Sequence, residues 1–326
     1  MGVEPQTSVS QRQVYMVLSP RALPYATLAL RSLLRNSHQP LHLHLITDSH
    51  ADKLQLSETM ESLQPEARHR WAVFAEDEML DAEATVFRGL ANLRAFRGGH
   101  PCWRKITDPL LLSEPGQELV LLDPDLYFPN RFQFEPTPDT GLLLMWQRPN
   151  CLFPPEIVRQ AMSLRIPLAD HVDIGVAHWR AGVDLEWIDW LIGQLGGASL
   201  PRIMHIEAIV WAAVAMHGGG GHLDPTRWVC WHRTQPVRLK RRLGVPGVSI
   251  LKSEPWNQMK CFHGGGDAKY WLPEFESTGL LQRGPDQFQP SPTIPFVEFT
   301  PSRFGRQQKA KSVLRSFGYY KLFGAS

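Results

Sequence analysis

Two aspartates one residue apart, Asp123 and Asp125, follow an apolar run at residues 119–122. Such a run is typical of a buried strand, and Pro124 ends it because proline lacks the amide hydrogen that a central strand needs. We therefore expect both carboxylates on a tight turn at the carboxyl edge of the sheet, where α/β folds bind ligands. Converging carboxylates repel each other unless a cation lies between them, and divalent cations shared with substrate phosphates take such oxygen ligands. The pair predicts a metal–diphosphate site. The alternative is an ordinary Asp-Pro turn with a solvated second aspartate.

A glycine-rich loop follows His263. It consists of Gly264, Gly265 and Gly266, and Lys269 lies three residues beyond it. Glycines allow a backbone to approach a ligand closely, and successive amides in such a loop can surround an anion. A neutral imidazole suits a transition metal such as Mn²⁺ better than Mg²⁺, and a lysine ammonium suits a phosphate. The loop predicts a second part of the same site. The alternative is a flexible loop with a surface histidine and lysine.

Composition places the chain among ordinary globular proteins. Its 326 residues are 43% hydrophobic and 20% charged, with a formal net charge of +2, so charge alone predicts no nucleic-acid partner. The four cysteines are scattered and form no Cys-x-x-Cys pair, which gives no indication of a zinc ribbon or redox motif. The polar N-terminus lacks an apolar signal core, and no apolar run approaches the ~20 residues that span a bilayer. We expect a cytoplasmic protein.

Strand and helix patterns alternate at the beginning of the chain. We expect strands at residues 14–18, 41–46 and 71–74, with helices at 25–34 and 52–63 between them. This βαβαβ order implies parallel strands with right-handed crossovers. Later patterns predict helices at 103–112, 154–163, 185–195 and 206–216, and strands at 119–122, 142–146, 172–179 and 260–263.

The end of the chain differs in composition from the rest. Residues 284–302 are rich in proline and polar residues and predict a linker or surface arm. From Arg303 onward, six cations occur without an acid, mixed with apolar and aromatic residues. This composition resembles a basic amphipathic segment that can lie on an anionic membrane, and a disordered solubilising end is the alternative. The expected division is a globular domain over residues 1–283, an arm over 284–302 and a tail over 303–326.

Taken in order, four stretches of the chain resemble metal-dependent glycosyltransferases of the GT-A fold. The similarity is greatest to glycosyltransferase family 8, which includes glycogenin and the bacterial lipopolysaccharide galactosyl- and glucosyltransferases. The stretches are the opening strand and helix at 14–18 and 25–36, the Asp-x-Asp within 119–127, the Asp-Ile-Gly-Val at 173–176, which is like the family's Asn-x-Gly-Val, and the His-x-x-Gly-x-x-Lys at 263–269. The resemblance implies an α/β GT-A (Rossmann-like) fold with a mixed, mostly parallel sheet flanked by helices.

Carried over to this sequence, the resemblance implies that Asp123, Asp125 and His263 ligate Mn²⁺, with Mg²⁺ as the alternative ion. Lys269 is expected to contact the diphosphate of a UDP-hexose donor, and the three glycines before it let the loop close over that donor. The implied reaction moves the hexosyl group to a hydroxyl of a glycan or lipid-linked glycan with retention of anomeric configuration. A lipid-linked acceptor fits a peripheral position on the inner face of a membrane.

Further residues are candidates for binding the donor. Tyr25 lies where the family's opening loop meets the nucleotide base. Arg104 and Lys105 precede the Asp-x-Asp strand, where the family places basic residues near the donor phosphate or sugar, and a solvated helix face is the alternative. The family's first strand usually ends in an aspartate that contacts the nucleotide. Because Ser-Pro-Arg stands at residues 19–21 here, Asp48 at the end of the second strand is the candidate replacement.

The catalytic residues implied by the resemblance are Asp125, Asp173 and Glu207. Asp173 stands where the family has asparagine, which alters the hydrogen-bonding capacity toward the donor sugar. Glu207 is the candidate for the acid of the family's Asp-Gln pair, and the glutamine is missing. Both side chains are expected to hold sugar hydroxyls.

Two other functions are compatible with these residues. A sugar-phosphate nucleotidyltransferase shares the α/β plan and the use of metal, but it normally has a glycine-rich phosphate loop directly after the first strand, which this chain lacks. A degenerate protein that binds a nucleotide-sugar without transfer is the second alternative, because the opening aspartate is missing.

Overall fold

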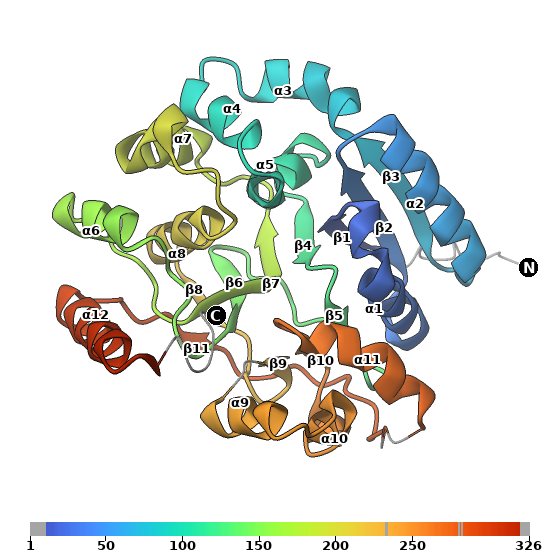
Figure 1. Ribbon diagram of the computed structural model, residues 1–326. Coiled ribbons are helices and arrows are strands. Elements are labelled where there is room, and N and C mark those ends of the chain that lie inside the picture. Colours follow the sequence, from blue (N-terminus) through green and yellow to red (C-terminus); the bar gives the residue numbers. More distant parts are fainter. Residues whose placement is uncertain (1–10, 232–233, 280, 282, 320–326) are drawn as a thin grey trace, which may run out of the picture.

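The computed structural model describes residues 11–231, 234–279, 281 and 283–319, and the rest of the chain lies outside the described residues. Within these residues the strands form a single mixed sheet in the centre of the molecule, with helices around it (Figure 1). Most strand pairs are parallel. The α/β fold with a mostly parallel sheet flanked by helices, which the sequence predicts, is therefore confirmed.

The first three strands and two α-helices form the predicted βαβαβ unit. Parallel strands β1 (Arg12–Val17), β2 (Leu41–Thr47) and β3 (Arg70–Ala75) are connected by α1 (Leu23–Asn36) and α2 (His50–Leu63). Each predicted segment overlaps its element, and the ends differ by a few residues, as helix and strand ends commonly do.

One strand is reversed in the middle of the sheet. The strands follow the order β3-β2-β1-β4-β7-β6-β9-β10-β5, in which β4 (Glu118–Leu122) is parallel to β1 and antiparallel to β7 (Val172–Arg180). Because β7 runs opposite to β4, the beginning of β7 lies beside the end of β4. This reversal brings Asp173 to the same edge as the two aspartates after β4.

Short strands complete the sheet on the side of β7. The pairing of β10 (Cys261–His263) with both β9 (Trp228–Cys230) and β5 (Leu126–Tyr127) places His263 beside Cys230 and opposite Leu126. The remaining strands are β6 (Leu142–Trp146), β8 (Gly220–His222) and β11 (Ile294–Pro295). The sequence patterns did not predict β5, β8, β9 or β11, since two or three residues are too few to show a period.

Alternate side chains of the central strands enter two different cores. Val14 and Met16 of β1 pack with α1 and α2 on one face, whereas Tyr15 and Val17 pack on the opposite face. The second face is covered by α5 (Arg104–Leu111), α7 (Leu185–Leu195) and α8 (Ile206–Gly218). Burial on both faces explains the nearly continuous apolar runs of these strands.

The other helices surround this framework. They are α3 (Leu80–Val86), α4 (Ala91–Arg97), α6 (Pro155–Ser163), α9 (Gln235–Arg242), α10 (Gly247–Leu251), α11 (Ala268–Ser277) and α12 (Pro301–Ser316). Short 3-10 turns lie at Pro20–Ala22, Glu76–Met79, Pro101–Trp103, Gly197–Ser199 and Trp256–Gln258. No helix in the described residues has the length and hydrophobicity that crossing a membrane requires.

Residues 284–302, which the sequence predicts to be a linker or surface arm, contact the rest of the fold at several points. β11 pairs with β8, an isolated bridge joins Gln287 to Phe132, and the side chain of Phe299 is buried. Thr300 then caps the N-terminus of α12, whose Phe304 is also buried. The first turn of α12 is thus anchored to the fold. Residues 320–326 of the predicted tail lie outside the described residues.

We predict that His44 makes the fold sensitive to acid. Burial, assisted by the nearby His42, lowers the pKa of His44 to about 3, and the ring stacks on Tyr15. Between pH 6.5 and pH 5, the histidine is protonated in the unfolded chain and neutral in the folded one, so stability falls as the pH falls. Wild-type protein should lose ~2 kcal/mol of unfolding free energy through this group by pH 5. His44→Phe should remove this contribution in urea titrations at pH 7.5 and 5, and an unchanged pH dependence would contradict the assignment.

Candidate functional site

The Asp-x-Asp turn is held in place by backbone hydrogen bonds from two directions. The Asp123 amide donates to the Gly175 carbonyl of β7 at 2.8 Å, and the Gly264 amide donates to the Asp125 carbonyl at 2.9 Å. β4 ends at Leu122 and β5 begins at Leu126, so the aspartates lie on the turn predicted from the sequence. These two hydrogen bonds fix the turn to β7 and to the glycine loop without the help of a ligand.

His263 is the last residue of β10 and lies between the carboxylates. Its Nε2 is 3.1 Å from Asp125 Oδ1 and 3.8 Å from Asp123 Oδ2. One potential ligand atom from each of these residues lies within 4.8 Å of the other two. The structure thus brings together the three side chains predicted to ligate the metal, although they are up to 140 positions apart in the sequence.

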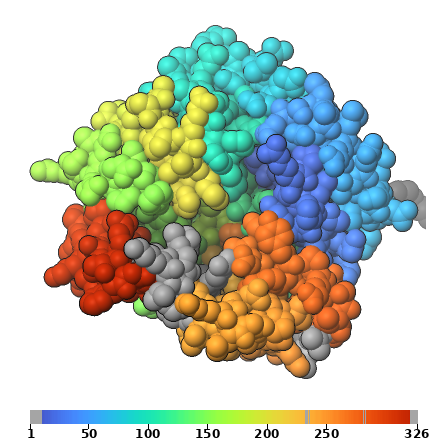
Figure 2. All heavy atoms as spheres, viewed as in Figure 1, coloured from blue at the N-terminus to red at the C-terminus, as the bar shows by residue number. Residues whose placement is uncertain are grey.

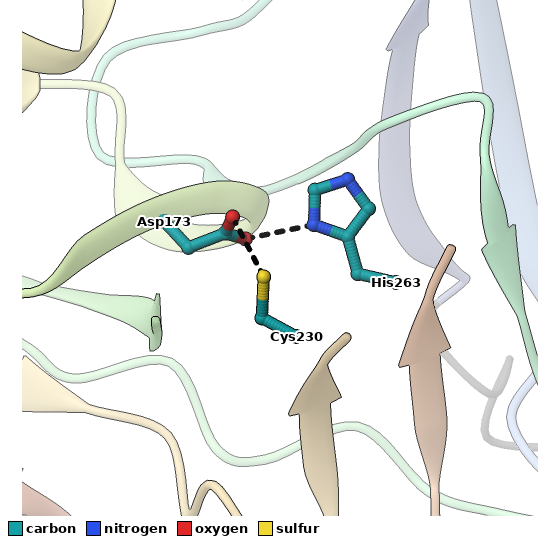
Figure 3. Close-up of side chains that lie close together, drawn as sticks. All are labelled: Asp173, Cys230 and His263. Atoms are coloured by element: carbon teal, nitrogen blue, oxygen red, sulfur yellow. Dashed lines mark hydrogen bonds and ion pairs between the residues drawn. The ribbon is translucent and has the colours of Figure 1, made fainter. Parts of the chain in front are cut away.

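Asp173 lies at the opposite edge of the imidazole ring, beside Nδ1. The Oδ1 atom of Asp173 is 3.0 Å from His263 Nδ1 and accepts a hydrogen bond from the Gly175 amide at 2.9 Å. Cys230 Sγ donates to Oδ2 of the same carboxylate at 3.2 Å. Figure 3 shows the carboxylate of Asp173 between the thiol and the imidazole ring. A carboxylate at Nδ1 fixes the ring orientation and leaves Nε2 for a metal. Both oxygens of Asp173 therefore contact protein groups, a role that the sequence did not indicate.

The glycine loop carries Lys269 back to the aspartates. Gly266 has a φ of 61°, which a glycine adopts without strain. The Lys269 amide donates to the Gly264 carbonyl at 3.1 Å, and its Nζ is 3.1 Å from Asp125 Oδ2. The same ammonium lies 4.5 Å from the centre of the Tyr25 ring, a cation–π arrangement. The predicted base-contacting and phosphate-contacting residues are therefore neighbours.

Lys105 joins two of the predicted acids. Its Nζ lies 2.6 Å from Asp123 Oδ1 and 2.9 Å from Glu207 Oε1, and only 7% of its side chain is exposed. The alternative of a solvated helix face is wrong for Lys105. Lys105 can be buried here because its ammonium is paired with two carboxylates, whereas an unpaired charge would be strongly unfavourable.

Arg104 faces a different pair of acids. Its guanidinium is 2% exposed, contacts Asp48 and Glu76, and donates to the Thr47 carbonyl. The solvated-face alternative is therefore wrong for Arg104 as well. The interaction links the end of β2 to the start of α5, and the side chain of Asp48 remains 43% exposed.

Charges at the site compensate one another. Burial alone lowers the pKa of His263, but the carboxylates of Asp173 and Asp125 outweigh it and hold that pKa well above its usual value. Burial likewise acts to raise the pKa of Asp125, but His263 and Lys269 lower it below its usual range. The carboxylates of Asp125 and Asp173, whose pKa values are both lowered, are therefore ionised around a protonated imidazole.

Glu207 differs from the aspartates. Burial raises its pKa to about 8, although Lys105 opposes the shift. Its Oε2 is buried and has no hydrogen-bond partner within the described residues. A buried oxygen without a partner is unfavourable, so this atom is suited to bind a ligand hydroxyl.

A divalent cation fits this arrangement on the chemistry of the donors. Two carboxylates and an imidazole nitrogen converge, and oxygen with nitrogen donors suits Mn²⁺. A cation there would replace the positive charge that the imidazole proton supplies in the metal-free site. Asp123, Asp125 and Nε2 of His263 are the atoms that would hold it.

The face of the molecule seen in Figure 2 is hollowed between the N-terminal part of the chain and the segments coloured yellow and orange. A separate cavity of about 450 Å³ lies at the opposite ends of β4 and β7. Leu142, Trp179, Trp187 and Trp211 line it, and it contains none of the predicted site residues.

Comparison with known proteins gives similarity in structure alone. No protein-family model and no curated protein matches the sequence. Mouse xyloside xylosyltransferase 1 is similar with 13% identity and a TM-score of 0.49, covering 79% of this chain and 99% of that one. GlyE, a glycosyltransferase of Streptococcus pneumoniae, has 13% identity and a TM-score of 0.48, covering 93% and 64%. The galactosyltransferase LgtC, solved with donor and acceptor sugar analogues, has 11% identity and a TM-score of 0.45, covering 84% and 97%.

These three proteins are glycosyltransferases, the class that the sequence motifs also resemble. Identities of 11–13% with TM-scores below 0.5 assign neither an activity nor the role of a residue to this chain. The function must therefore be argued from the chemistry of its own side chains.

We predict that Gly175→Ala weakens Mn²⁺ binding without removing a ligand. A Cβ at this position would lie 2.6 Å from His263 Nδ1 and 2.9 Å from Asp173 Oδ1, so the imidazole and its carboxylate partner must move apart. Loss of such a partner typically lowers metal affinity ~10–100-fold. Calorimetric titration with Mn²⁺ should show a decrease in this range.

Gly305→Ala in α12 is the matched control, because a Cβ there meets no atom within 4 Å. It should bind Mn²⁺ like the wild type, and thermal melts of both variants should show that they fold. Wild-type affinity in Gly175→Ala would show that the contact between Asp173 and His263 does not support the metal site.

Proposed function

We propose that this chain is a metal-dependent glycosyltransferase. It moves a hexosyl group from a UDP-linked donor to a hydroxyl of a glycan or lipid-linked glycan, with retention of anomeric configuration. The observation that carries this proposal is the convergence of Asp123, Asp125 and Nε2 of His263 beside the ammonium of Lys269. The alternation of acids and cations there fits a diphosphate bound through a divalent cation.

The reaction breaks the bond between the anomeric carbon and a diphosphate oxygen, which leaves new negative charge on the diphosphate. Lys269 follows the glycine loop and supplies a positive charge beside Asp125. A bound divalent cation would neutralise further charge on the leaving group. The loop backbone can approach the phosphates because residues 264–266 have no side chains in the way, while the amides of Gly264 and Gly265 donate to the carbonyls of Asp125 and His263.

Two acids are assigned to different tasks. Asp173 orients His263 through Nδ1, as its 3.0 Å contact supports. Glu207 has the buried and unpartnered Oε2, which we assign to a hydroxyl of the donor sugar. Asp123 and Asp125 contact Lys105 and Lys269, respectively, so neither is a free nucleophile. We therefore favour attack on the same face of the sugar, with a phosphate oxygen of the leaving group accepting the proton of the acceptor hydroxyl.

The proposed metal–diphosphate site predicts how nucleotide binding depends on Mn²⁺. Calorimetry of UDP with wild-type protein should show tight binding with Mn²⁺ and weak binding without it. Asp125→Asn should bind UDP in Mn²⁺ only as weakly as the metal-free wild type, because one carboxylate ligand is lost. Asp139→Asn, a change at a carboxylate that is 98% exposed, is the matched control and should behave as wild type.

Failure of Asp125→Asn to reduce UDP binding would refute the metal–diphosphate site. Binding of GDP in place of UDP with the same dependence would refute the base assignment alone. Formation of pyrophosphate from UTP and a sugar phosphate would instead identify a nucleotidyltransferase. Metal-dependent UDP binding without release of UDP from any UDP-hexose and glycan acceptor would identify a degenerate binding protein.

We further propose a cytoplasmic protein that contacts the inner face of a membrane through α12. Beyond its anchored first turn, this helix exposes Val313 and Leu314, which are 46% and 39% exposed, and Phe317 directly after the helix is 80% exposed. Lys309 and Arg315 lie among them and are also exposed. Apolar side chains next to cations suit the interface of an anionic bilayer.

Phe317→Ser combined with Arg315→Gln should reduce co-sedimentation with phosphatidylserine vesicles, since it removes one apolar contact and one cation. UDP binding should stay unchanged, because α12 lies outside the metal site. Arg88→Gln, which removes one exposed cation outside α12, is the control. Equal sedimentation of the wild type and the double variant would exclude contact through α12.

A further inference from the structure

His263 can bind a metal through either of its ring nitrogens. Nε2 faces Asp123 and Asp125, whereas Nδ1 lies 3.0 Å from Asp173 Oδ1. Cys230 ends the strand next to β10, in register with His263, and its Sγ lies 3.2 Å from Asp173 Oδ2. Figure 3 shows thiol, carboxylate and imidazole side by side. One ligand atom from each lies within 4.8 Å of the other two.

We propose that Asp173, Cys230 and Nδ1 of His263 form a second metal site, selective for thiophilic ions such as Zn²⁺, whose occupation excludes a cation from the Asp123–Asp125–Nε2 site. Sulfur and nitrogen ligands favour Zn²⁺, whereas carboxylate and water ligands favour Mn²⁺ and Mg²⁺. Three protein ligands leave the fourth tetrahedral position of a zinc ion for water.

The selectivity follows from the one type of ligand in which the two sites differ. Both sites use His263 and at least one carboxylate, but only the second contains a thiol. When zinc binds, the thiol proton of Cys230 and the Nδ1 proton of the protonated imidazole both pass to water, and no oxidation or reduction takes place. A thiolate is a poor ligand for Mn²⁺, so Mn²⁺ remains at the oxygen-rich site.

The exclusion follows from the chemistry of one imidazole. A neutral ring has one nitrogen with a free electron pair and one that carries a proton. A cation on Nε2 requires the proton on Nδ1, where it is donated to Asp173. A cation on Nδ1 requires the proton on Nε2, where it is donated to Asp125 at 3.1 Å. Each ion therefore fixes the ring in the form that the other ion cannot bind.

This inference extends the proposed function, because a thiophilic ion would then inhibit the enzyme by competing with Mn²⁺. Its ligands can nevertheless be tested without nucleotide or turnover. Co²⁺ replaces Zn²⁺ in tetrahedral sites and gives a thiolate-to-cobalt charge-transfer absorption in the near ultraviolet. That absorption reports a sulfur ligand directly.

The first experiment is a Co²⁺ titration of the reduced full-length protein, followed by displacement with Zn²⁺. Wild type should show the charge-transfer band, and Cys230→Ser should lose it and bind Zn²⁺ at least tenfold more weakly. Cys151→Ser is the matched control, since its thiol donates to the Val172 carbonyl and belongs to neither ligand group, and it should keep the band. Thermal melts should establish that both variants fold, with Cys230→Ala as a second variant.

The second experiment measures Mn²⁺ affinity at increasing Zn²⁺ concentration. The apparent Mn²⁺ affinity of wild type should fall in proportion to Zn²⁺ occupancy, whereas Cys230→Ser should need at least tenfold more Zn²⁺ for the same effect. A band that persists in Cys230→Ser, or both ions bound together in wild type, would overturn the proposal. If UDP fails to bind while these results hold, the proposed function fails and the second site stands. If UDP binds with Mn²⁺ but Zn²⁺ competition does not depend on Cys230, only the second site fails.

Discussion

Compensation of buried negative charge is the constraint on which this region of the molecule depends. Four carboxylates meet at one edge of the sheet, and each would be strongly destabilised if it were ionised and alone. Three cations are placed between them: Lys105 contacts Asp123 and Glu207, His263 contacts Asp125 and Asp173, and Lys269 contacts Asp125. No acid in this group depends on solvent for its only counter-charge. A charged ligand that binds here must therefore replace one of these ion pairs with a pair of its own.

Much of this arrangement could be predicted from short segments of the sequence. The apolar run before Asp123 and the proline after it place the aspartates at a strand end, and the structure has them there. The glycines after His263 likewise predict a loop that can approach a ligand. These predictions succeed because strand ends and glycine loops are specified by neighbouring residues, whose steric and hydrogen-bonding properties act locally.

The remaining contacts depend on the order and direction of strands, which local patterns do not encode. The contact of Asp173 with His263 exists because β7 runs opposite to β4, and that of Cys230 with Asp173 exists because β9 and β10 are in register. Cys230 appeared in the sequence as one scattered cysteine. Lys105 appeared as one of two adjacent cations on a helix, and only tertiary packing shows that it is buried between two acids. Sequence spacing could not have separated it from its neighbour Arg104, which faces other partners.

The reversed direction of β7 also has a consequence for how the protein unfolds. The site combines segments around residues 105, 123, 173, 207 and 263, which span about half of the chain, and the reversed β7 supplies one of them. No single supersecondary unit therefore contains a complete set of ligands. Partial opening of any one of these segments removes a ligand or its counter-charge. A cation or nucleotide bound there would thus be linked to cooperative global unfolding and would protect distant strands from hydrogen exchange together.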